Sequence, residues 1–386
     1  MTKIFDALTP VNNEASLNEM LKELESERSN TPHGIISRWQ VINNALMRYW
    51  RFRMIYTIAG GSGSGKSYFM NQLRFDITDQ EPMIVDVRNV PNSVIEYAET
   101  HGEFRYRNNT LVREPLNDNR EFQVLNLHFG FEMHPIFENL RTVSALTGYG
   151  YQYLLSSYGV RMEDDAGIRY QYNKLSDGEM KLIERIKDSL VQKMRNMLVF
   201  KQSGSRTEIY NTVYKAYDSY VKRNPNIKLC VSLDHSLLTK KAEESGDLEL
   251  QNELIRTLID VRDDFGAMVI PIIQTNSNME DVRRRSDNGA HYPVKSDLYM
   301  GGQFYQGSDF LAVMLQPMSI GISEYGPRRV PTSNLIHWSL IKSRYNIPGQ
   351  IWLWNGLEKS KILTCLLEDN TNRPIPKPNL ANIKAW

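Results

Sequence analysis

The sequence contains one short stretch, GGSGSGKS, in which glycine and serine alternate before a Lys-Ser pair. Its spacing satisfies G-x-x-x-x-G-K-[ST], because Gly60 is followed by Gly65, Lys66 and Ser67. Glycines let the backbone wrap closely around an anion, so that N–H groups point at phosphate oxygens. The lysine reaches the terminal phosphates, and the serine hydroxyl can ligate Mg²⁺. The stretch therefore predicts an ATP–Mg²⁺ site at Gly60, Gly61, Ser62, Gly63, Ser64, Gly65, Lys66 and Ser67.

Hydrolysis of a bound nucleotide also needs an acid near the metal, a base that orients water and a cation for the transition state. Two aspartates end apolar runs and compete for the first role, Asp86 in MIVDV and Asp234 in LCVSLD. Asp234 is favoured, because its run is the more strongly apolar and a helix and another strand follow it. The alternative for Asp86 is a structural aspartate on the surface.

Two further polar residues follow apolar runs. Glu132 ends QVLNLHFGFE, and Gln274 ends VIPIIQ. Parallel α/β sheets place their chemistry at the carboxyl ends of strands, so Glu132 is the candidate base and Gln274 a candidate sensor of the third phosphate. On the residues alone, a glutamate after a strand is usually a solvated loop residue, and the alternative for Gln274 is a simple loop hydrogen bond.

The elements that would position these residues alternate along the chain. Strands are predicted at MIYTIAG, QVLNLHFGFEM, KLCVSLD, AMVIPIIQTN, FLAVMLQP, LIHWSLIKSR and QIWLWNG. Helices are predicted after Lys66, over 134–157, over 176–196, over 207–224 and over 249–266, and Ser176 with Glu179 has capping-box spacing. This alternation predicts a three-layer α/β fold with a mostly parallel central sheet.

Two segments lie outside this alternation. Residues 14–28 predict a helix with Ser16 and Glu19 at capping-box spacing, and its apolar face consists of Leu17, Met20, Leu21 and Leu24. That face could pack on its own domain or dock on a neighbouring subunit. Residues 78–121 contain a short strand, PMIVDV, and a pattern typical of a hairpin around Asn108-Asn109.

Composition limits the classes of function. The 386 residues carry a formal net charge of +1, so any nucleic-acid contact must come from a local patch. The two cysteines, Cys230 and Cys365, lie far apart, which argues against a disulfide framework or a zinc site. Because no apolar run is long enough to cross a bilayer and the N-terminus has no signal pattern, we expect a cytoplasmic protein without membrane contact.

Taken in order, these segments resemble the motor domain of the DnaB-type hexameric replicative DNA helicases, a RecA-like P-loop ATPase of bacteria and phages. The resemblance covers about 31–362 and rests on TPHG, IAGGSGSGKS, FEM, KLSDGE, VSLDHSLL and PIIQTN. It implies that Glu132 activates the attacking water, that Asp234 supports the metal shell and that Gln274 senses the third phosphate.

The segment IKSRYN resembles the family's Lys-X-Arg-Asn. The resemblance implies that Lys342 and Arg344 complete the nucleotide site of a neighbouring subunit, with Arg344 as the arginine finger. Without it, such a pair on an edge strand is most often a solvated face. A finger supplied in trans implies a homo-oligomeric ring, six-fold by family, and gives the helix over 14–28 a neighbour on which to dock.

The sequence departs from the family in three places. Only about thirty residues precede the motor, where the family has a helical collar, so contacts with primase or a loader are in doubt. In SDLYMGGQ, Tyr299 and Met300 replace an arginine and an acid of the family. DNA contact would then come from the backbone near Gly301 and Gly302, or from Arg283, Arg284 and Arg285, whose alternative is a mobile solvated loop.

The sequence thus predicts an N-terminal arm (1–30), a motor domain (31–365) with an insertion (78–121), and a C-terminal tail (366–386). The predicted function is an ATP-driven ring helicase that translocates on single-stranded DNA. Two alternatives remain: a RecA-type recombinase or other filament-forming ATPase, and a nucleotide-dependent structural or DNA-packaging component.

Overall fold

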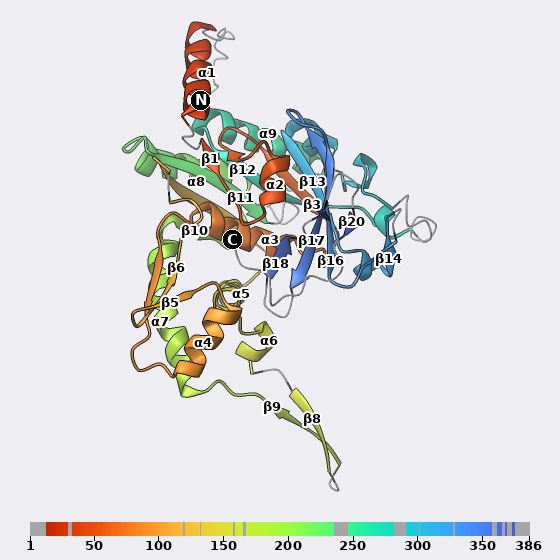
Figure 1. Cartoon of the computed structure of the whole chain (residues 1–386). Coiled ribbons are helices and arrows are strands. Elements are labelled where there is room, and N and C mark those ends of the chain that lie inside the picture. The colour runs from red at the N-terminus through yellow and green to blue at the C-terminus, as the bar shows by residue number, and fades with distance from the viewer. Residues whose placement is uncertain are drawn as a thin grey trace.

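The structure is a computed structural model. It describes residues 13–29, 33–118, 120–131, 133–156, 159–164, 167–234, 246–281, 291–300, 302–326, 329–356, 361–364, 367–368 and 373–374. Within these ranges the central feature is a nine-stranded sheet with the order β10–β7–β11–β12–β3–β13–β16–β17–β18 (Figure 1).

The strands from β10 to β13 are parallel, and β16, β17 and β18 extend the sheet antiparallel. In sheet order they are β10 Met197–Phe200, β7 Gln123–Gly130, β11 Ile227–Asp234, β12 Met268–Gln274, β3 Tyr56–Gly60, β13 Phe310–Leu315, β16 Leu335–Ser343, β17 Gly349–Gly356 and β18 Lys361–Thr364. The mostly parallel α/β sheet predicted from the sequence is therefore confirmed.

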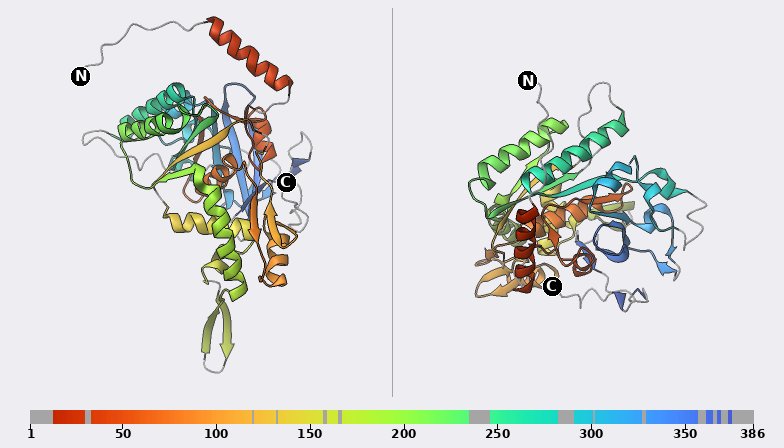
Figure 2. Two further views of the ribbon diagram at one scale, coloured as in Figure 1. Left: turned by 90° about the vertical axis from the view of Figure 1, so that its left-hand side faces the viewer. Right: turned by 90° about the horizontal axis from the view of Figure 1, so that it is seen from above.

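Helices cover both faces of this sheet (Figure 2). On one face, α2 (Gln40–Ala45) and α3 (Lys66–Ile77) pack over Ile58 and its neighbours. On the other, α8 (Arg206–Ala216), α9 (Asp247–Phe265) and α11 (Gly302–Gly307) cover Ala59 and its neighbours. Successive side chains of a strand point to opposite faces, so strands covered on both sides are apolar throughout. This arrangement gives the three layers.

A smaller body lies beside the sheet, below it in Figure 1. Its three-stranded sheet has the order β4–β6–β5, and its core includes Val85, Leu111 and Leu182. Asn108 and Asn109 have φ of 48° and 63° between β5 and β6, which confirms the predicted hairpin. The elements are β4 Met83–Asp86, α4 Asn92–His101, β5 Arg105–Arg107, β6 Thr110–Arg113, α5 Pro135–Thr147, α6 Tyr151–Leu154 and α7 Asp177–Lys193.

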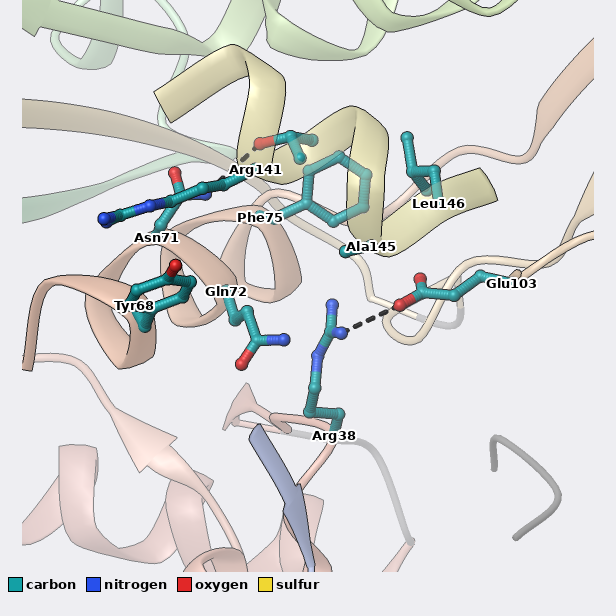
Figure 3. A pocket seen from close by; sticks show the side chains of 10 residues that line it. Arg38, Tyr68, Asn71, Gln72, Phe75, Glu103, Arg141, Ala145 and Leu146 are labelled. Atoms are coloured by element: carbon teal, nitrogen blue, oxygen red, sulfur yellow. Dashed lines mark hydrogen bonds and ion pairs between the residues drawn. The ribbon is translucent and has the colours of Figure 1, made fainter. Parts of the chain in front are cut away.

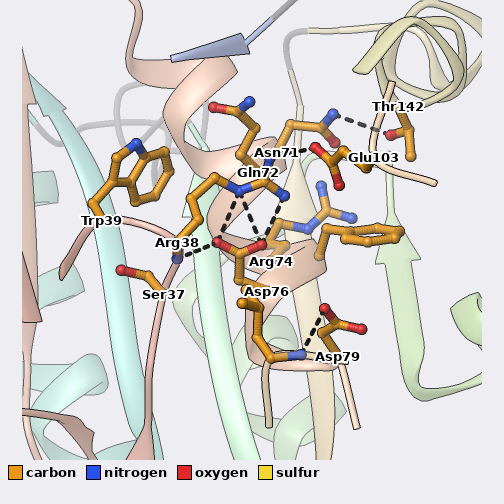
Figure 4. A network of polar contacts seen from close by, with 12 residues as sticks. Ser37, Arg38, Trp39, Asn71, Gln72, Arg74, Asp76, Asp79, Glu103 and Thr142 are labelled. Atoms are coloured by element: carbon orange, nitrogen blue, oxygen red, sulfur yellow. Dashed lines mark hydrogen bonds and ion pairs between the residues drawn. The ribbon is translucent and has the colours of Figure 1, made fainter. Parts of the chain in front are cut away.

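Buried ion pairs join this smaller body to α3 (Figure 4). Arg38 contacts Asp76 at 2.7 Å and Glu103 at 2.9 Å. Arg113 contacts Glu103 at 2.8 Å and Asp79 at 2.6 Å, and Lys193 of α7 pairs with Asp79 as well. Asp76 lies in the last turn of α3 and Asp79 two residues beyond it, so ion pairs connect the chain segment containing Glu103 and Arg113 to the helix that begins at the phosphate loop.

Several elements differ from the sequence predictions. The helix predicted over 134–157 ends at Thr147, because Gly148 adopts a left-handed φ of 76° and the short α6 follows. Helix α1 runs from Asn13 to Arg28, so Ser16 and Glu19 lie inside the helix rather than at its start. The capping box of Ser176 and Glu179 is confirmed. An unpredicted antiparallel pair consists of β8 Gly159–Asp164 and β9 Gly167–Tyr172.

The remaining short elements connect or extend these bodies. They are β1 Gly34–Ile35, β2 Trp50–Arg51, η1 Met194–Asn196, the π-helix η2 Tyr217–Val221, η4 Ser277–Glu280, η5 Lys295–Asp297, η6 Pro317–Ile320, β14 Glu324–Tyr325, β15 Val330–Pro331, β19 Leu367–Glu368 and β20 Arg373–Pro374. Among the helices in the described ranges, none has the length and apolarity that crossing a membrane would require.

Candidate nucleotide-binding site

The phosphate loop connects β3 to α3. Gly63 and Gly65 have φ of 72° and 91°, a left-handed conformation that glycine adopts without strain. No side chain caps the N-terminus of α3, so its first N–H groups stay available to an anion. The ammonium group of Lys66 donates to the carbonyl oxygens of Gly60 at 2.8 Å and Gly61 at 2.5 Å. The Lys66 side chain therefore lies against the loop that would bind the phosphates.

The first glycine of the loop is required by close packing. A Cβ atom at Gly60 would come within 2.5 Å of Ser64 Oγ and 2.6 Å of the Met314 carbonyl oxygen. At Gly61, the nearest atom is Thr275 Oγ1 at 3.6 Å. The loop therefore closes tightly against β13 at one position and stays open at the next. This cradle, together with the lysine and the uncapped helix terminus, fits a triphosphate with its Mg²⁺.

The predicted partners of the loop follow from strand register. Gln274 pairs with Gly60 across β12 and β3, and Asp234 pairs with Gly130 across β11 and β7. All four residues end parallel strands, so they lie at the same edge of the sheet. Asp234 is buried, and its carbonyl oxygen accepts a hydrogen bond of 2.8 Å from Phe131 N. Glu132 lies outside the described residues, one position after this bond.

Asp86, the competing aspartate, lies elsewhere. It ends β4 in the three-stranded sheet rather than a strand of the central sheet. Its carboxylate forms an exposed ion pair with Arg88 at 2.5 Å. The Arg88 guanidinium holds the pKa of Asp86 down at about 2. The geometry is that of a structural surface aspartate, which was the alternative interpretation.

A buried polar layer beneath the site was not predicted. Asn126 Oδ1 accepts from Arg74 Nε at 3.4 Å, and His128 Nδ1 lies 2.9 Å from Ser232 Oγ. Burial, Arg74 and Lys201 lower the pKa of His128, so the ring is neutral at physiological pH. Asn126 and His128 alternate within an apolar strand, and this polar pair facing α3 is the signal that could have revealed the layer.

A small, open pocket lies between α3 and α5 (Figure 3). The Arg141 guanidinium stacks on the ring of Tyr68, the residue after Ser67, at 3.7 Å from the centroid. Gln72 is buried beside them, and its Oε1 accepts from Ile362 N at 3.1 Å. The pocket therefore brings α5 and β18 against the first two turns of the phosphate-loop helix.

Lys342 and Arg344 lie near the amino ends of the parallel strands, opposite the phosphate loop. Register places Lys342 beside Leu311 of β13, which lies beside Thr57 of β3. The Arg344 N–H donates to the Asp309 carbonyl oxygen at 3.0 Å, and its Nε lies 3.6 Å from the Asp309 carboxylate. With ~3.3 Å of rise per residue, Lys342 is about 10 Å along the strands from the loop and Arg344 farther. Neither residue lies at the phosphate-loop end of the strands in this chain.

Both cations are held against backbone carbonyl groups at the C-terminal end of α11. Lys342 donates to the carbonyl oxygens of Tyr305 and Gln306, the second at 2.9 Å. Arg344 Nη2 also donates to the Gln306 carbonyl oxygen at 2.9 Å. Burial and the neighbouring Arg344 charge lower the pKa of Lys342 to about 8.

The proposed DNA-contact segment begins at the end of β12. The Tyr299 N–H donates to the Gln274 carbonyl oxygen at 3.0 Å, which ties this segment to the sheet. Met300 has a left-handed φ of 47°, and Gly302 begins α11. Gly301 and the three arginines, Arg283, Arg284 and Arg285, lie outside the described residues.

No family model matches the sequence, and no curated protein matches it. Two solved structures are similar in fold. One, described as an ATPase domain, aligns over 92% of this chain and 99% of its own, with a TM-score of 0.63 and 16% identity. The other, a DnaB-like replicative helicase described with its interactions with primase, aligns over 93% of this chain and 67% of its own, with a TM-score of 0.62 and 16% identity. The chain therefore has the RecA-like α/β fold of the ATPase domains of DnaB-like helicases.

Proposed function

We propose that this protein is an ATP-driven ring helicase that translocates on single-stranded DNA, and that it belongs to the DnaB-type family. The observation that carries the proposal is the order of residues along one sheet edge. In sheet order, β7 ends two residues before Glu132, β11 ends at Asp234, β12 ends at Gln274, and β3 ends where the phosphate loop begins. This is the set that phosphoryl transfer to water needs, apart from the cation.

Each residue has one role in the proposed site. Lys66 and the loop N–H groups bind the phosphates, and Ser67 with Asp234 holds Mg²⁺, which neutralises charge on the phosphates. Glu132 orients and deprotonates the attacking water. Gln274 links the third phosphate to the DNA-contact segment, because its backbone bonds Tyr299. Domain boundaries at residues 30 and 365, with an insertion over 78–121, remain part of this proposal.

The missing cation comes from a second subunit in the proposed mechanism. Lys342 and Arg344 lie at the edge opposite the phosphate loop, so a head-to-tail arrangement of subunits can bring them to the neighbouring nucleotide. Head-to-tail contacts close into a ring when the rotation permits, and six subunits are proposed by analogy. Helix α1, whose Leu17, Leu21 and Leu24 are exposed, would dock on a neighbour in the same ring.

The proposed DNA contact lies on the chain between β12 and α11. Backbone N–H groups at Gly301 and Gly302, and the three arginines at 283–285, would bind phosphates without reading base sequence. Such contacts suit a motor that moves along DNA. Primase or a loader protein is proposed as a further partner, on the basis of the similar helicase described with primase.

The decisive measurement is ATP turnover with and without single-stranded DNA for the wild type, Glu132→Gln and Arg344→Ala. We expect DNA to stimulate the wild type, and each variant to lose at least about 100-fold in turnover. An equal mixture of the two variants should regain activity, because about one quarter of head-to-tail interfaces then combine an intact Glu132 with an intact Arg344. Arg88→Ala, which breaks an exposed pair, is the matched control.

Two results would contradict the proposal. Turnover that DNA leaves unchanged, with Arg344→Ala as active as the wild type, would favour the structural or packaging alternative. DNA-stimulated turnover in open filaments, seen by electron microscopy, would favour the recombinase alternative. Strand separation of a forked duplex by closed rings would distinguish the helicase from both.

A further inference from the structure

Two pairs of exposed apolar side chains border the two halves of the proposed site. Ile136 and Phe137 are 64% and 43% exposed in the first turn of α5, which follows Glu132 closely in the chain. Tyr345 and Ile347 are 53% and 84% exposed in the turn between β16 and β17, next to Arg344. We call these pairs the α5 patch and the β16–β17 patch.

The α5 patch is held in a fixed conformation. His134 caps the helix by accepting from Ile136 N at 3.4 Å, and its ring meets the Phe137 ring edge-on at 6.4 Å. Glu138, next in the same turn, pairs with Lys201 at 2.5 Å. The two apolar side chains therefore project from a helix turn that is anchored on both sides.

The β16–β17 patch is equally well anchored. Ser343 Oγ accepts from Tyr345 N at 3.2 Å and from Asn346 N at 2.8 Å. The Asn346 side chain accepts from Ile347 N at 2.8 Å and donates to the Ala45 carbonyl oxygen at 3.3 Å, which ties the turn to α2. A tight turn thus presents two large apolar groups to solvent.

Fixed apolar groups are suited to forming a contact. Burying them in an interface releases water, and little conformational freedom is lost because the backbone of each turn is already ordered. The two patches lie at opposite edges of the sheet, since one follows the carboxyl end of β7 and the other adjoins Arg344, level with Asp309 before β13. One subunit cannot bring them together, whereas a second copy can.

We infer that the β16–β17 patch of one subunit packs on the α5 patch of the next, and that this contact sets Arg344 against the neighbouring phosphate loop. The inference rests on the proposed function, which identifies a second copy of this chain as the occupant. The contact is heterologous, because two different surfaces of the same protein meet, and repetition of it generates a ring.

Crosslinking tests the pairing directly. One preparation carries Phe137→Cys and another Ile347→Cys, both with Cys365→Ser, while Cys230 is buried. A short bis-maleimide, which alkylates one cysteine thiol at each end, should produce covalent dimers from the mixture and not from either preparation alone. Val191→Cys, at a similarly exposed apolar residue of α7, replaces Phe137→Cys in the control mixture. Absence of dimers from the test mixture, or equal dimers from the control mixture, would overturn the inference.

Charge substitution tests the same contact without a reagent. Ile347→Asp and Phe137→Asp should each raise the protein concentration needed for half-assembly at least about tenfold in analytical ultracentrifugation. Mixing Ile347→Lys with Phe137→Glu should restore assembly of the interfaces that combine them. Ile84→Asp and Val191→Asp, at exposed apolar residues away from both patches, should assemble as the wild type does. Equal assembly of all four Asp variants would refute the contact.

These assays need neither DNA nor hydrolysis, so the two proposals can fail separately. Crosslinked rings whose turnover ignores DNA would retain the contact and reject the helicase. DNA-stimulated turnover that survives both Ile347→Asp and Phe137→Asp, with unchanged assembly, would retain the helicase and reject the contact. Thermal melting of each variant verifies that the exposed substitutions leave the fold intact.

Discussion

Gln274 lies directly beside Gly60 in the central sheet, and its carbonyl oxygen accepts a hydrogen bond from Tyr299 N. One residue thus adjoins both the phosphate loop and the proposed DNA-contact segment. We expect Gln274→Ala to keep nucleotide affinity within about threefold and to lose most of the DNA stimulation of turnover, since the amide no longer reports the third phosphate.

Gln123→Ala is the control for this prediction, because Gln123 is an exposed glutamine that begins β7 at the opposite edge of the same sheet. Fluorescent-nucleotide titration and steady-state turnover with and without DNA separate the two effects. Intact stimulation in Gln274→Ala would show that the coupling runs through another residue.

Gly60→Ala and Gly61→Ala form a matched pair at the phosphate loop. The new Cβ at Gly60 would collide with Ser64 Oγ and the Met314 carbonyl oxygen, whereas the one at Gly61 meets nothing closer than 3.6 Å. We expect Gly60→Ala to lower the free energy of unfolding by about 1–3 kcal/mol and to weaken nucleotide binding. Gly61→Ala should change that free energy by less than about 0.5 kcal/mol. Urea denaturation measures both, and equal effects would contradict the packing argument.

Turnover should fall as pH rises through the pKa of Lys342. Burial and Arg344 lower this pKa to about 8, so the ammonium group is charged below pH 8 and progressively neutral above it. Arginine stays charged throughout this range. Lys342→Arg should therefore keep its turnover where the wild type declines, between pH 7 and pH 9.5. A pH–rate profile checks this, and an identical decline in both proteins would exclude Lys342 as its cause.

Acid should destabilise the fold through His337. This buried ring lies 2.9 Å from the Tyr325 hydroxyl, and burial lowers its pKa to about 3. Between pH 6.5 and pH 3 the unfolded state binds a proton that the folded state does not, so stability falls as pH falls. From pH 7 to pH 5 the loss from this residue is about 2 kcal/mol. Between pH 7 and pH 5, the free energy of unfolding should therefore fall by about 2 kcal/mol less in His337→Gln than in the wild type. An equal fall in both proteins would contradict this prediction.

Asp79→Ala and Asp86→Ala contrast a buried carboxylate with an exposed one. Asp79 is fully buried between Arg113 and Lys193, so its removal leaves Lys193 without its carboxylate partner and Arg113 with Glu103 alone. We expect a loss of about 3–5 kcal/mol in the free energy of unfolding. Asp86→Ala should be nearly neutral, since water screens its pair with Arg88. Calorimetry of both variants decides, and equal losses would contradict the burial argument.

The phosphate-loop edge of the sheet could be predicted from the sequence, because apolar strands end at Asp234 and Gln274 and a glycine-rich turn follows Tyr56–Gly60. Such signals are local. The remote position of Arg344 relative to Lys66 could not be predicted from the residues, because it depends on the antiparallel placement of β16 beside β13. It was available only through the family resemblance.

Other differences between the predicted and the observed structure have different origins. Strands β8 and β9 contain the alternating apolar and polar runs VRME and IRYQY, so the period-2 strand pattern was present in the sequence and was overlooked. Capping-box spacing at Ser16 and Glu19 also occurs inside helices, and α1 begins earlier, at Asn13. The ion pairs of Arg38 with Asp76 and of Arg113 with Asp79 join residues tens of positions apart. A charged residue in a sequence gives no indication of which distant residue it will contact.

Buried ion pairs form the joint between α3 and the smaller body. Asp76 in the last turn of α3 contacts Arg38, and Asp79, two residues beyond the helix, contacts Arg113 and Lys193. Arg113, the last residue of β6, thereby connects the β5–β6 hairpin through a buried ion pair to the chain that leaves the helix beginning at Lys66.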